Sequence, residues 1–435
     1  MSRRPFTRQA SLNPVPLTSV GVSPGPRRCP SRDKQLHAKA VSSARKWVSW
    51  REVCEEPFRL FFPLATLAGL LGVLLWPAMI WGWIESYPGP SHARLMIHGF
   101  FGGFILGFMG TAMPRLVDSR PFNAREVGLL LTWFTGSVIA NTIGSNGWGD
   151  ILFVLGLGSL FFLLRARCHS GKTQLPATFI LVAFGFVSAL AGLALQAASR
   201  WWETPYQLVL LSKLLSYHAF ILLAVMGAGG FLLPRFLGTG VRRKASDEAQ
   251  AASLRRMDVR AAQLAAFFAL LSYGMEALAW PVWAAMVRGA CVSAFFCYHI
   301  PVERLRWSWQ GVHPFLLIGL GCIPLGILAA AWLPGARVGL LHFELMGGFG
   351  LITLGVATRV VLGHSGGRSR LERTNPVLLS VFALVLLGLM ARVSAEFLPH
   401  IQISHYLYAA FAWVVGLILW ACWVLPGVMR PDPEG

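Results

Sequence analysis

Twelve long apolar segments restrict the folds open to this chain more than any other feature. Each runs for roughly 17 to 27 residues, about the length that a helix needs to cross the hydrocarbon core of a bilayer. The segments are residues 58–84, 92–114, 125–144, 150–166, 175–198, 206–234, 259–279, 281–300, 311–334, 338–362, 374–397 and 402–427. The sequence therefore predicts an all-α polytopic membrane protein with about twelve transmembrane helices. Segments 150–166, which is short, and 281–300, which carries Arg288, give the weakest signals.

The basic residues predict how the helices are oriented. Clusters of Arg and Lys fill the N-terminal arm and alternate loops, such as those around Arg120, Arg242 and Arg370, whereas the intervening loops carry few cations. By the positive-inside rule, both termini lie in the cytoplasm, and we expect a multi-pass membrane protein. The net charge of +19 is then mostly a topology signal. We expect the lipid bilayer as a partner and no nucleic acid, because no basic patch with interleaved aromatics stands outside the loops.

The chain divides into an arm and a membrane domain. Residues 1–50 are rich in Pro, Ser and Arg without apolar periodicity, which predicts a disordered basic cytoplasmic arm. Their Arg-rich, acid-poor composition also resembles a transit peptide, which is the alternative interpretation. Residues 51–435 form the predicted twelve-helix domain. A long cytoplasmic loop at 236–258, with room for a surface helix, separates six helices from six.

A histidine recurs on every fourth apolar segment, each time 17 residues before an arginine. The three instances are His98 to Arg115, His218 to Arg235 and His342 to Arg359. This period predicts a three-fold pseudo-repeat of four helices. Seventeen helical residues span roughly 25 Å, so the histidines are expected at one depth, near the membrane face opposite the arginines. Because an imidazole in hydrocarbon is costly unless it is partnered or metal bound, the recurrence favours a shared site.

The neighbours of these histidines extend the candidate site. Glu344 and Met346 follow His342 closely and are groups that bind metals, although a carbonyl hydrogen bond and simple packing remain the alternative. His92 and His98 stand roughly 240° apart around one helix, so only one of them is expected to face a pocket.

Two further features bear on a cofactor. His218 lies beside Tyr217, with Lys213 shortly before it, a group too polar to face lipid. Lys213 and Arg288 would serve either as partners of heme propionates or as a transport relay. Glycines crowd the three histidine-bearing segments, and they suit either close helix packing or the flat wall of a macrocycle; their position beside histidines favours the macrocycle. They are Gly99, Gly102, Gly103, Gly107, Gly110, Gly227, Gly229, Gly230, Gly347, Gly348 and Gly350.

The ordered motifs resemble one family across most of the chain. PFRLFFPLA begins at Pro57, HARLMIHGFFGGF at His92, HFELMGGFG at His342 and TRVVLGHSG at Thr358. From Pro57 to the end of the chain, the sequence is similar to the NnrS family of bacterial membrane proteins. The resemblance implies twelve membrane helices, heme and copper as cofactors, and a role in the response to nitric oxide during denitrification or nitrosative stress.

The chain departs from the family pattern at its first motif. Where the family typically reads HAHEMxxGF, this chain has Arg94 and Leu95 in place of the second histidine and the glutamate, and His98 stands where an apolar residue is usual. The resemblance carries over to His92, His342 and His364, and to Arg359.

The two lines of argument together define the candidate site residues. We expect heme b to be held by residues among His92, His98, His218, His342, His364 and Arg359. The candidate metal ligands, with copper as a second metal, are His92, His218, His342, Glu344 and Met346. Nitric oxide or another diatomic is the expected small ligand, and an electron-transfer partner is implied without being identified.

His364 allows two interpretations. It ends a helix among glycines, so it either caps the last carbonyls or binds an anion, such as a heme propionate or a lipid phosphate, together with Arg359 and Arg368.

Two function classes remain open. The recurrence on helices two, six and ten also resembles the catalytic subunit of heme-copper oxidases, although the chain lacks the paired histidine on the seventh helix that a three-histidine copper site needs. The first class is an NnrS-like heme protein of the nitric oxide response, in which redox catalysis is left open. The second is a cofactor-free transporter or sensor that uses intramembrane His, Lys and Arg.

Overall fold

The computed structural model describes residues 47–199, 201–240 and 246–432. Most of the predicted disordered arm, up to residue 46, lies outside the described residues. Where the description begins, Ser49 caps a short helix, α2 (Trp50–Glu55), by accepting a hydrogen bond from the Glu52 amide. The only β pairing among the described residues is an isolated bridge between Gln310 and Thr374.

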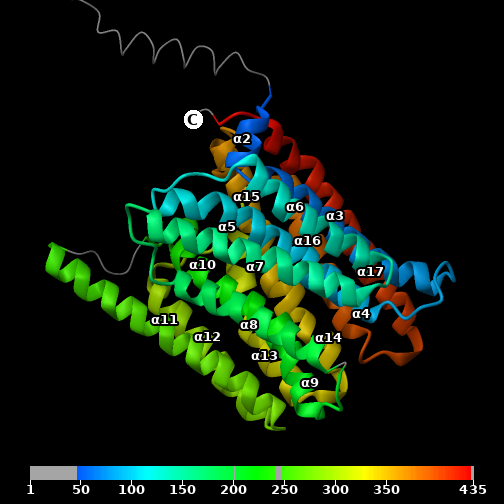
Figure 1. The fold of residues 1–435 in the computed structure, drawn as a ribbon. Coiled ribbons are helices and arrows are strands. Elements are labelled where there is room, and N and C mark those ends of the chain that lie inside the picture. Colours follow the sequence, from blue (N-terminus) through cyan, green and yellow to red (C-terminus); the bar gives the residue numbers. More distant parts are fainter. Residues whose placement is uncertain (1–46, 200, 241–245, 433–435) are drawn as a thin grey trace, which may run out of the picture. The chain divides into compact units, whose positions relative to one another are not determined.

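Helices make up nearly all of the described chain (Figure 1). In order they are α3 (Phe58–Ile80), α4 (Gly89–Arg94), η1 (Leu95–Phe101), α5 (Gly102–Leu116), α6 (Ala124–Thr142), α7 (Asn146–Ser170), α8 (Phe179–Ala198), α9 (Tyr206–Lys213), η2 (Leu214–Ala219), α10 (Phe220–Phe236), α11 (Glu248–Ala277), α12 (Pro281–His299), α13 (His313–Trp332), α14 (Arg337–His342), η5 (Phe343–Gly350), α15 (Leu351–His364), α16 (Pro376–Ser394) and α17 (Gln402–Val424). Short 3₁₀ turns lie at Val302–Arg304, Pro334–Ala336, Arg368–Leu371, Pro399–Ile401 and Leu425–Met429.

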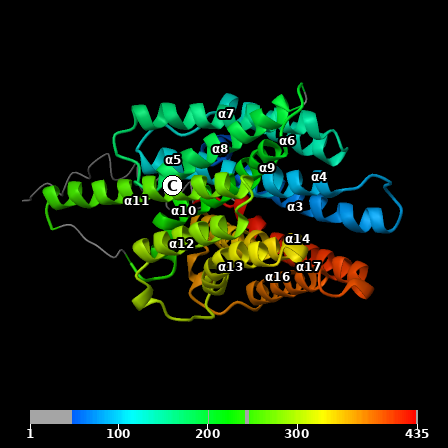
Figure 2. The same ribbon diagram turned by 90° about the horizontal axis from the view of Figure 1, so that it is seen from below.

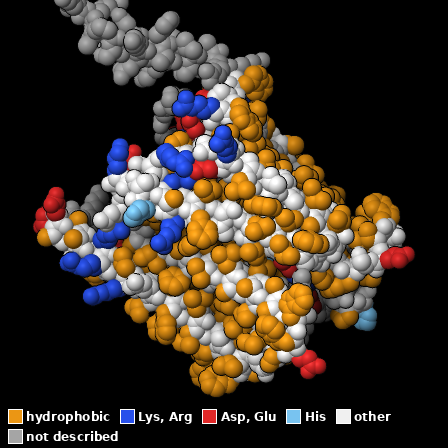
Figure 3. Space-filling view, viewed as in Figure 1, with side chains coloured by type: hydrophobic (Ala, Val, Ile, Leu, Met, Phe, Trp, Pro, Cys, Tyr) orange, Lys and Arg blue, Asp and Glu red, His pale blue; other side chains and the backbone are white. Residues whose placement is uncertain are grey.

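Ten helical segments within the described ranges are long and apolar enough to cross a membrane, so the prediction of an all-α polytopic membrane protein is confirmed. Apolar side chains cover the middle of the face seen in Figure 3, while Lys and Arg gather toward its upper left. This surface suits contact with lipid around the middle of the helices.

The two other expected segments also form helices, α6 and α11, but both are less apolar than the ten. α6 begins with Arg125 and Glu126, and the first turns of α11 are polar, which lowers their mean hydropathy. The expectation that 150–166 and 281–300 are the weakest spans is therefore wrong. Both lie in helices, α7 and α12, that are among the ten long and apolar enough to cross a membrane.

The second half of the predicted loop at 236–258 is helical, in keeping with the surface helix for which the sequence left room. Asp247 accepts a hydrogen bond from the Gln250 amide and starts α11 at Glu248. That helix then continues without a break to Ala277.

The helices pack in three consecutive groups of four, as Figures 1 and 2 let the reader follow. Each histidine-bearing helix is counted once, although it carries three labels: α4–η1–α5, α9–η2–α10 and α14–η5–α15. Counted in this way, α3 to α7 form the first group, α8 to α12 the second and α13 to α17 the third. Neighbouring groups meet where α7 packs on α8, α12 on α13 and α17 on α3. The histidine-bearing helices also touch one another, through α5 with α15 and α10 with η5.

A π-helical segment interrupts each of the three histidine-bearing helices. η1 contains His98, η2 contains His218, and η5 begins directly after His342. π-helical turns are rare and occur frequently at functional sites. The sequence recurrence thus has a counterpart in the backbone.

The glycines of these helices serve helix packing. A methyl group added to Gly99 would lie 2.8 Å from Ala68 Cβ, one on Gly103 would lie 2.7 Å from Ala65 Cβ, and one on Gly348 would lie 2.6 Å from Ile323 Cγ1. Neighbouring helices fill the space that these glycines leave. At these three positions the structure favours helix packing over the wall of a macrocycle site.

Candidate functional site

A large internal cavity lies at the end of the helices where α4, α9 and α14 begin. Its volume is about 750 Å³, and its lining comes from α3, α4, η1, the α9–η2 region, the α14–η5 region, α16 and α17. His92, His218, His342 and Met346 all line it. The structure therefore brings together three of the predicted histidines and the predicted thioether.

Two of these imidazoles are fixed by backbone carbonyls. His92 Nδ1 lies 2.9 Å from the Gly72 carbonyl oxygen, and His342 Nδ1 lies 2.8 Å from that of Val338. Because a carbonyl only accepts, each Nδ1 carries the proton and donates it, which leaves the Nε2 lone pair free. This tautomer and this kind of partner are typical of metal-binding histidines.

His218 differs from the other two cavity histidines in lacking such a partner. Its buried Nδ1 makes no hydrogen bond with the described residues and lies 3.7 Å from a carboxylate oxygen of Glu344. The Glu344 side chain is fully buried behind the cavity wall, and neither of its oxygens accepts a hydrogen bond within the described ranges. A buried carboxylate that accepts no hydrogen bond is costly, so this pair is a candidate functional group.

His98 faces away from the cavity, against α7. Its ring stacks on Phe153 at 4.1 Å between centroids, and Nδ1 lies 3.9 Å from Asp150. Neither ring nitrogen makes a hydrogen bond in the described part of the chain. Of the two histidines on this helix, His92 is the one that lines the cavity.

Two arginines that were not predicted from the sequence line the same cavity, and each is paired with a carboxylate. Arg94 makes a two-pronged ion pair with Asp150 through distances of 2.7 and 2.8 Å. Arg392 bonds Glu396 at 2.7 Å. The signal for the first pair was present, because a cation inside one apolar segment needs an anion from another, and Asp150 opens the fourth segment.

Aromatic side chains and a lysine complete the lining. Trp76 packs edge-on against His92, with ring centroids 5.9 Å apart, and Arg392 lies over the ring of Tyr406. Lys213 faces the cavity from α9. Arg288, the other predicted propionate partner, lies elsewhere, bonded to Ser272 and Glu276 between α11 and α12.

His364 and Arg359 lie away from the cavity lining, near the other end of α15. His364 Nδ1 lies 2.9 Å from Glu56 and 3.2 Å from Asp432. Arg359 donates to the Phe236 carbonyl oxygen at 3.1 Å. His364 therefore lies between two carboxylates of the chain itself, which already supply anionic partners for its ring.

Glu56 is the centre of this second group, which we call the Glu56 cluster: Glu56, Arg59, Arg115, His364 and Asp432. Glu56 also pairs with Arg115 and, at 2.5 Å, with Arg59. Burial alone would raise the pKa of Glu56, but the hydrogen bond and charge of His364 and the charges of the two arginines lower it to about 2. Donor atoms of Glu56, His364 and Asp432 lie within 4.8 Å of one another, yet the arginines already neutralise the carboxylate that a metal would need. The cluster therefore ties α2, α5, α15 and the C-terminal segment together.

The architecture and the cavity define a class: a polytopic helical membrane protein with an internal, histidine-lined cavity near one membrane face. A family model described as NnrS protein matches residues 52–431, so the chain belongs to the NnrS family. A comparison with curated proteins finds none that matches the chain. The family match confirms the resemblance drawn from the motifs, whereas the resemblance to heme-copper oxidases stays a prediction.

Proposed function

We propose that this NnrS family protein binds heme in the histidine-lined cavity and acts in the response to nitric oxide. One observation carries the proposal: His92 and His342 line the same cavity, and each holds its Nδ1 proton on a carbonyl and leaves Nε2 free. The family resemblance supplies the cofactor and the nitric oxide context.

The residues present fit a heme. A cavity of about 750 Å³ falls within the range of about 300 to 1,000 Å³ for cofactor and ligand sites. Trp76 and Trp413 give its walls large apolar faces, and Lys213 supplies positive charge for a carboxylate such as a propionate. The chain has no C-x-x-C-H motif, which favours non-covalent heme b.

Two histidines of the cavity have the geometry to bind a heme. His92 and His342 are the imidazoles ready to bind iron, since their second nitrogens are already oriented by Gly72 and Val338. Bound heme iron would supply diatomic binding and electron exchange.

Copper is proposed as a second metal. His218 and Met346 line the cavity together, and imidazole and thioether are ligands that copper accepts. Glu344, which lies 3.7 Å from the His218 ring, would balance the positive charge.

We also propose a bacterial inner-membrane location with both termini in the cytoplasm. The two described ends of the chain meet, because the Val48 amide donates to the Met429 carbonyl oxygen at 3.2 Å. The first and last described residues thus lie at one end of the helices, the same end as the basic loops that the positive-inside rule assigns to the cytoplasm. Reporter fusions after Gly435 and in the loop between α3 and α4 should give opposite topologies.

The function is tested by a reduced-minus-oxidised visible spectrum of the detergent-purified protein, with iron and copper measured on the same sample. We expect heme b bands with near-stoichiometric iron in the wild type and their loss in His342→Ala. His364→Ala is the matched control, because it removes an imidazole from the other end of the same continuous helix, and it should keep the bands. A colourless, metal-free wild type from heme-replete cells would overturn the proposal in favour of a transporter or sensor.

A further inference from the structure

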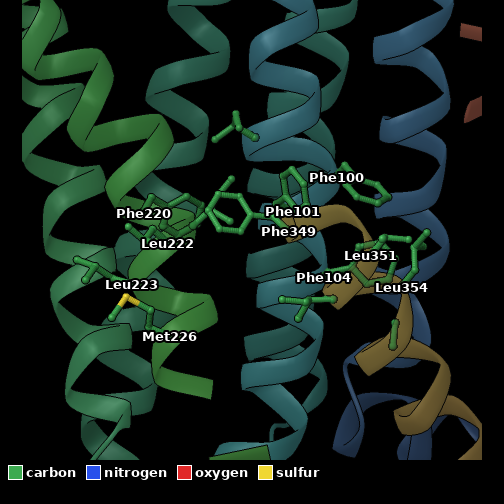
Figure 4. Close-up of a cluster of buried hydrophobic side chains, with 14 of the residues drawn as sticks. Phe100, Phe101, Phe104, Phe220, Leu222, Leu223, Met226, Phe349, Leu351 and Leu354 are labelled. Carbon is green, nitrogen blue, oxygen red and sulfur yellow. The ribbon is translucent and has the colours of Figure 1, made fainter. Parts of the chain in front are cut away.

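A second, smaller internal space lies between the three histidine-bearing helices, beyond the large cavity. Its volume is about 80 Å³, and α5, α10 and α15 line most of it, with Phe104, Ile105, Ala224, Ala228, Ile352 and Val356 among its walls. The helices of all three groups therefore contribute to one site. Figure 4 shows the buried side chains that surround this region.

The lining of this space is apolar. Thr353 is the one residue with a polar side chain among those that line it in the described part of the chain. A buried water needs about two to four polar partners, so this space is not suited to hold one. Its volume is also well below that of sites for drug-sized ligands, which occupy about 300 Å³ or more. An apolar molecule of two or three atoms fits both limits.

Phe101 joins this space to the histidine cavity, because its side chain lines both. It stands in η1, three residues after His98, and packs edge-on against Phe349 of η5, with ring centroids 6.3 Å apart (Figure 4). From Phe101 to Met109, the last residue of α5 that lines the space, the helix rises by roughly 12 Å. The apolar space thus extends from the cavity wall along the helices toward the arginine end.

We propose that the space between α5, α10 and α15 is a binding site for a small apolar gas molecule, and that Phe101 separates this site from the histidine cavity. Such gases dissolve readily in hydrocarbon, and an apolar cavity that stays dry binds an apolar guest without losing hydrogen bonds. The inference rests on the proposed function for its physiological meaning, since it places a reservoir of nitric oxide or a similar diatomic next to the heme cavity.

Xenon is the probe for the binding site, because it is apolar, of similar size and visible by anomalous scattering. We expect one xenon site between α5, α10 and α15 in crystals of the full chain under xenon pressure. Ala228→Leu adds three carbon atoms inside the space and should abolish that site, and Val356→Phe does the same from α15 if the first variant fails to fold. Ala183→Leu, on the lipid-exposed side of α8, is the matched control and should leave the site occupied. Absence of xenon from the wild type, or unchanged occupancy in the filled variants, would overturn the proposal.

The role of Phe101 is tested in the heme-loaded protein. After photolysis, nitric oxide should rebind several-fold more slowly in Ala228→Leu than in Ala183→Leu, and faster in Phe101→Ala. Equal rates in all variants would contradict a route through this site. The xenon result does not depend on heme, so failure of the gas site and failure of the proposed heme function can be told apart.

Discussion

The two ends of the histidine-bearing helices differ in how completely their buried polar residues are paired, although ion pairs such as Arg94 with Asp150 occur at the cavity end as well. At the Glu56 cluster, every ionisable side chain of the set has a partner of opposite charge. At the cavity end, Glu344 is fully buried with no hydrogen bond to the described residues, and so is His218 Nδ1. The first arrangement stabilises a fold, whereas the second costs stability and persists for another reason.

The backbone conformation of these helices also differs between the histidine end and the arginine end. The three π-helical segments all lie at the histidine end, while the arginine end of α5, α10 and α15 is regular α-helix. The cofactor proposed above would account for the polar residues and the irregular helix together, because it would bind the imidazole nitrogens, and π-helical turns occur frequently at functional sites. The predictions below test this contrast between a structural end and a functional end.

The largest effect is expected for Glu56→Ala. Removing one partner of a buried ion pair leaves the buried Arg59 charge uncompensated, at a cost of about 3 to 5 kcal/mol. The unfolding midpoint in detergent should fall strongly. The heme spectrum of the remaining folded protein should not change, because the cluster does not line the cavity.

Glu55→Ala is the control for that variant. Glu55 is the preceding residue and pairs with the exposed Arg51, a kind of pair that contributes little. Its midpoint should stay close to that of the wild type. Equal losses for the two variants would show that the Glu56 cluster is not a buried structural site.

A somewhat smaller effect is expected from pH. Because the pKa of Glu56 is lowered to about 2 in the folded protein, its contribution to stability is fully present above its ordinary pKa of about 4.3 and is lost as the pH falls toward 2. By pH 3 the loss should reach about 2 kcal/mol. Thermal unfolding from pH 6 to pH 3 measures it, and Glu56→Gln should flatten this part of the curve. A Glu56→Gln curve as steep as the wild-type curve would contradict the assignment.

The sequence predicted the helices far better than the site. Apolar length alone located ten membrane-crossing helices, because a span needs little more than enough apolar residues. The π-helical segments were not predictable, since they follow from packing between helices and not from any residue pattern at Leu95 or Leu214. The Glu56 cluster was missed for a related reason: its members come from four parts of the chain that only the packed helices bring together.

The site itself was predicted in part. Spacing around one helix indicated that His92 and His98 face different ways, but it could not say which faces inward, because that depends on α7 offering Phe153 and Asp150 to His98. Arg94 replaces a residue of the family motif, and only the structure pairs it with Asp150. Glycines beside a histidine suit two uses, and the choice between them depends on neighbours such as Ala65 and Ala68.

The smallest effect on stability is expected for Glu344→Gln, which sets the two ends of the molecule directly against each other. The same change of carboxylate to amide at Glu56 breaks pairs with Arg59 and Arg115, whereas at Glu344 it removes a buried carboxylate that accepts no hydrogen bond from the described residues. We therefore expect Glu344→Gln to leave the free energy of unfolding unchanged or to raise it by no more than about 1 kcal/mol. The same variant should alter the copper content or the heme spectrum, because the His218 ring lies 3.7 Å from the Glu344 carboxylate. The test compares Glu344→Gln with Glu56→Gln by thermal unfolding and by metal analysis. If Glu344→Gln destabilises the protein as much as Glu56→Gln and leaves metal and spectrum untouched, Glu344 is a structural residue, and the division of these helices into a structural end and a functional end is wrong.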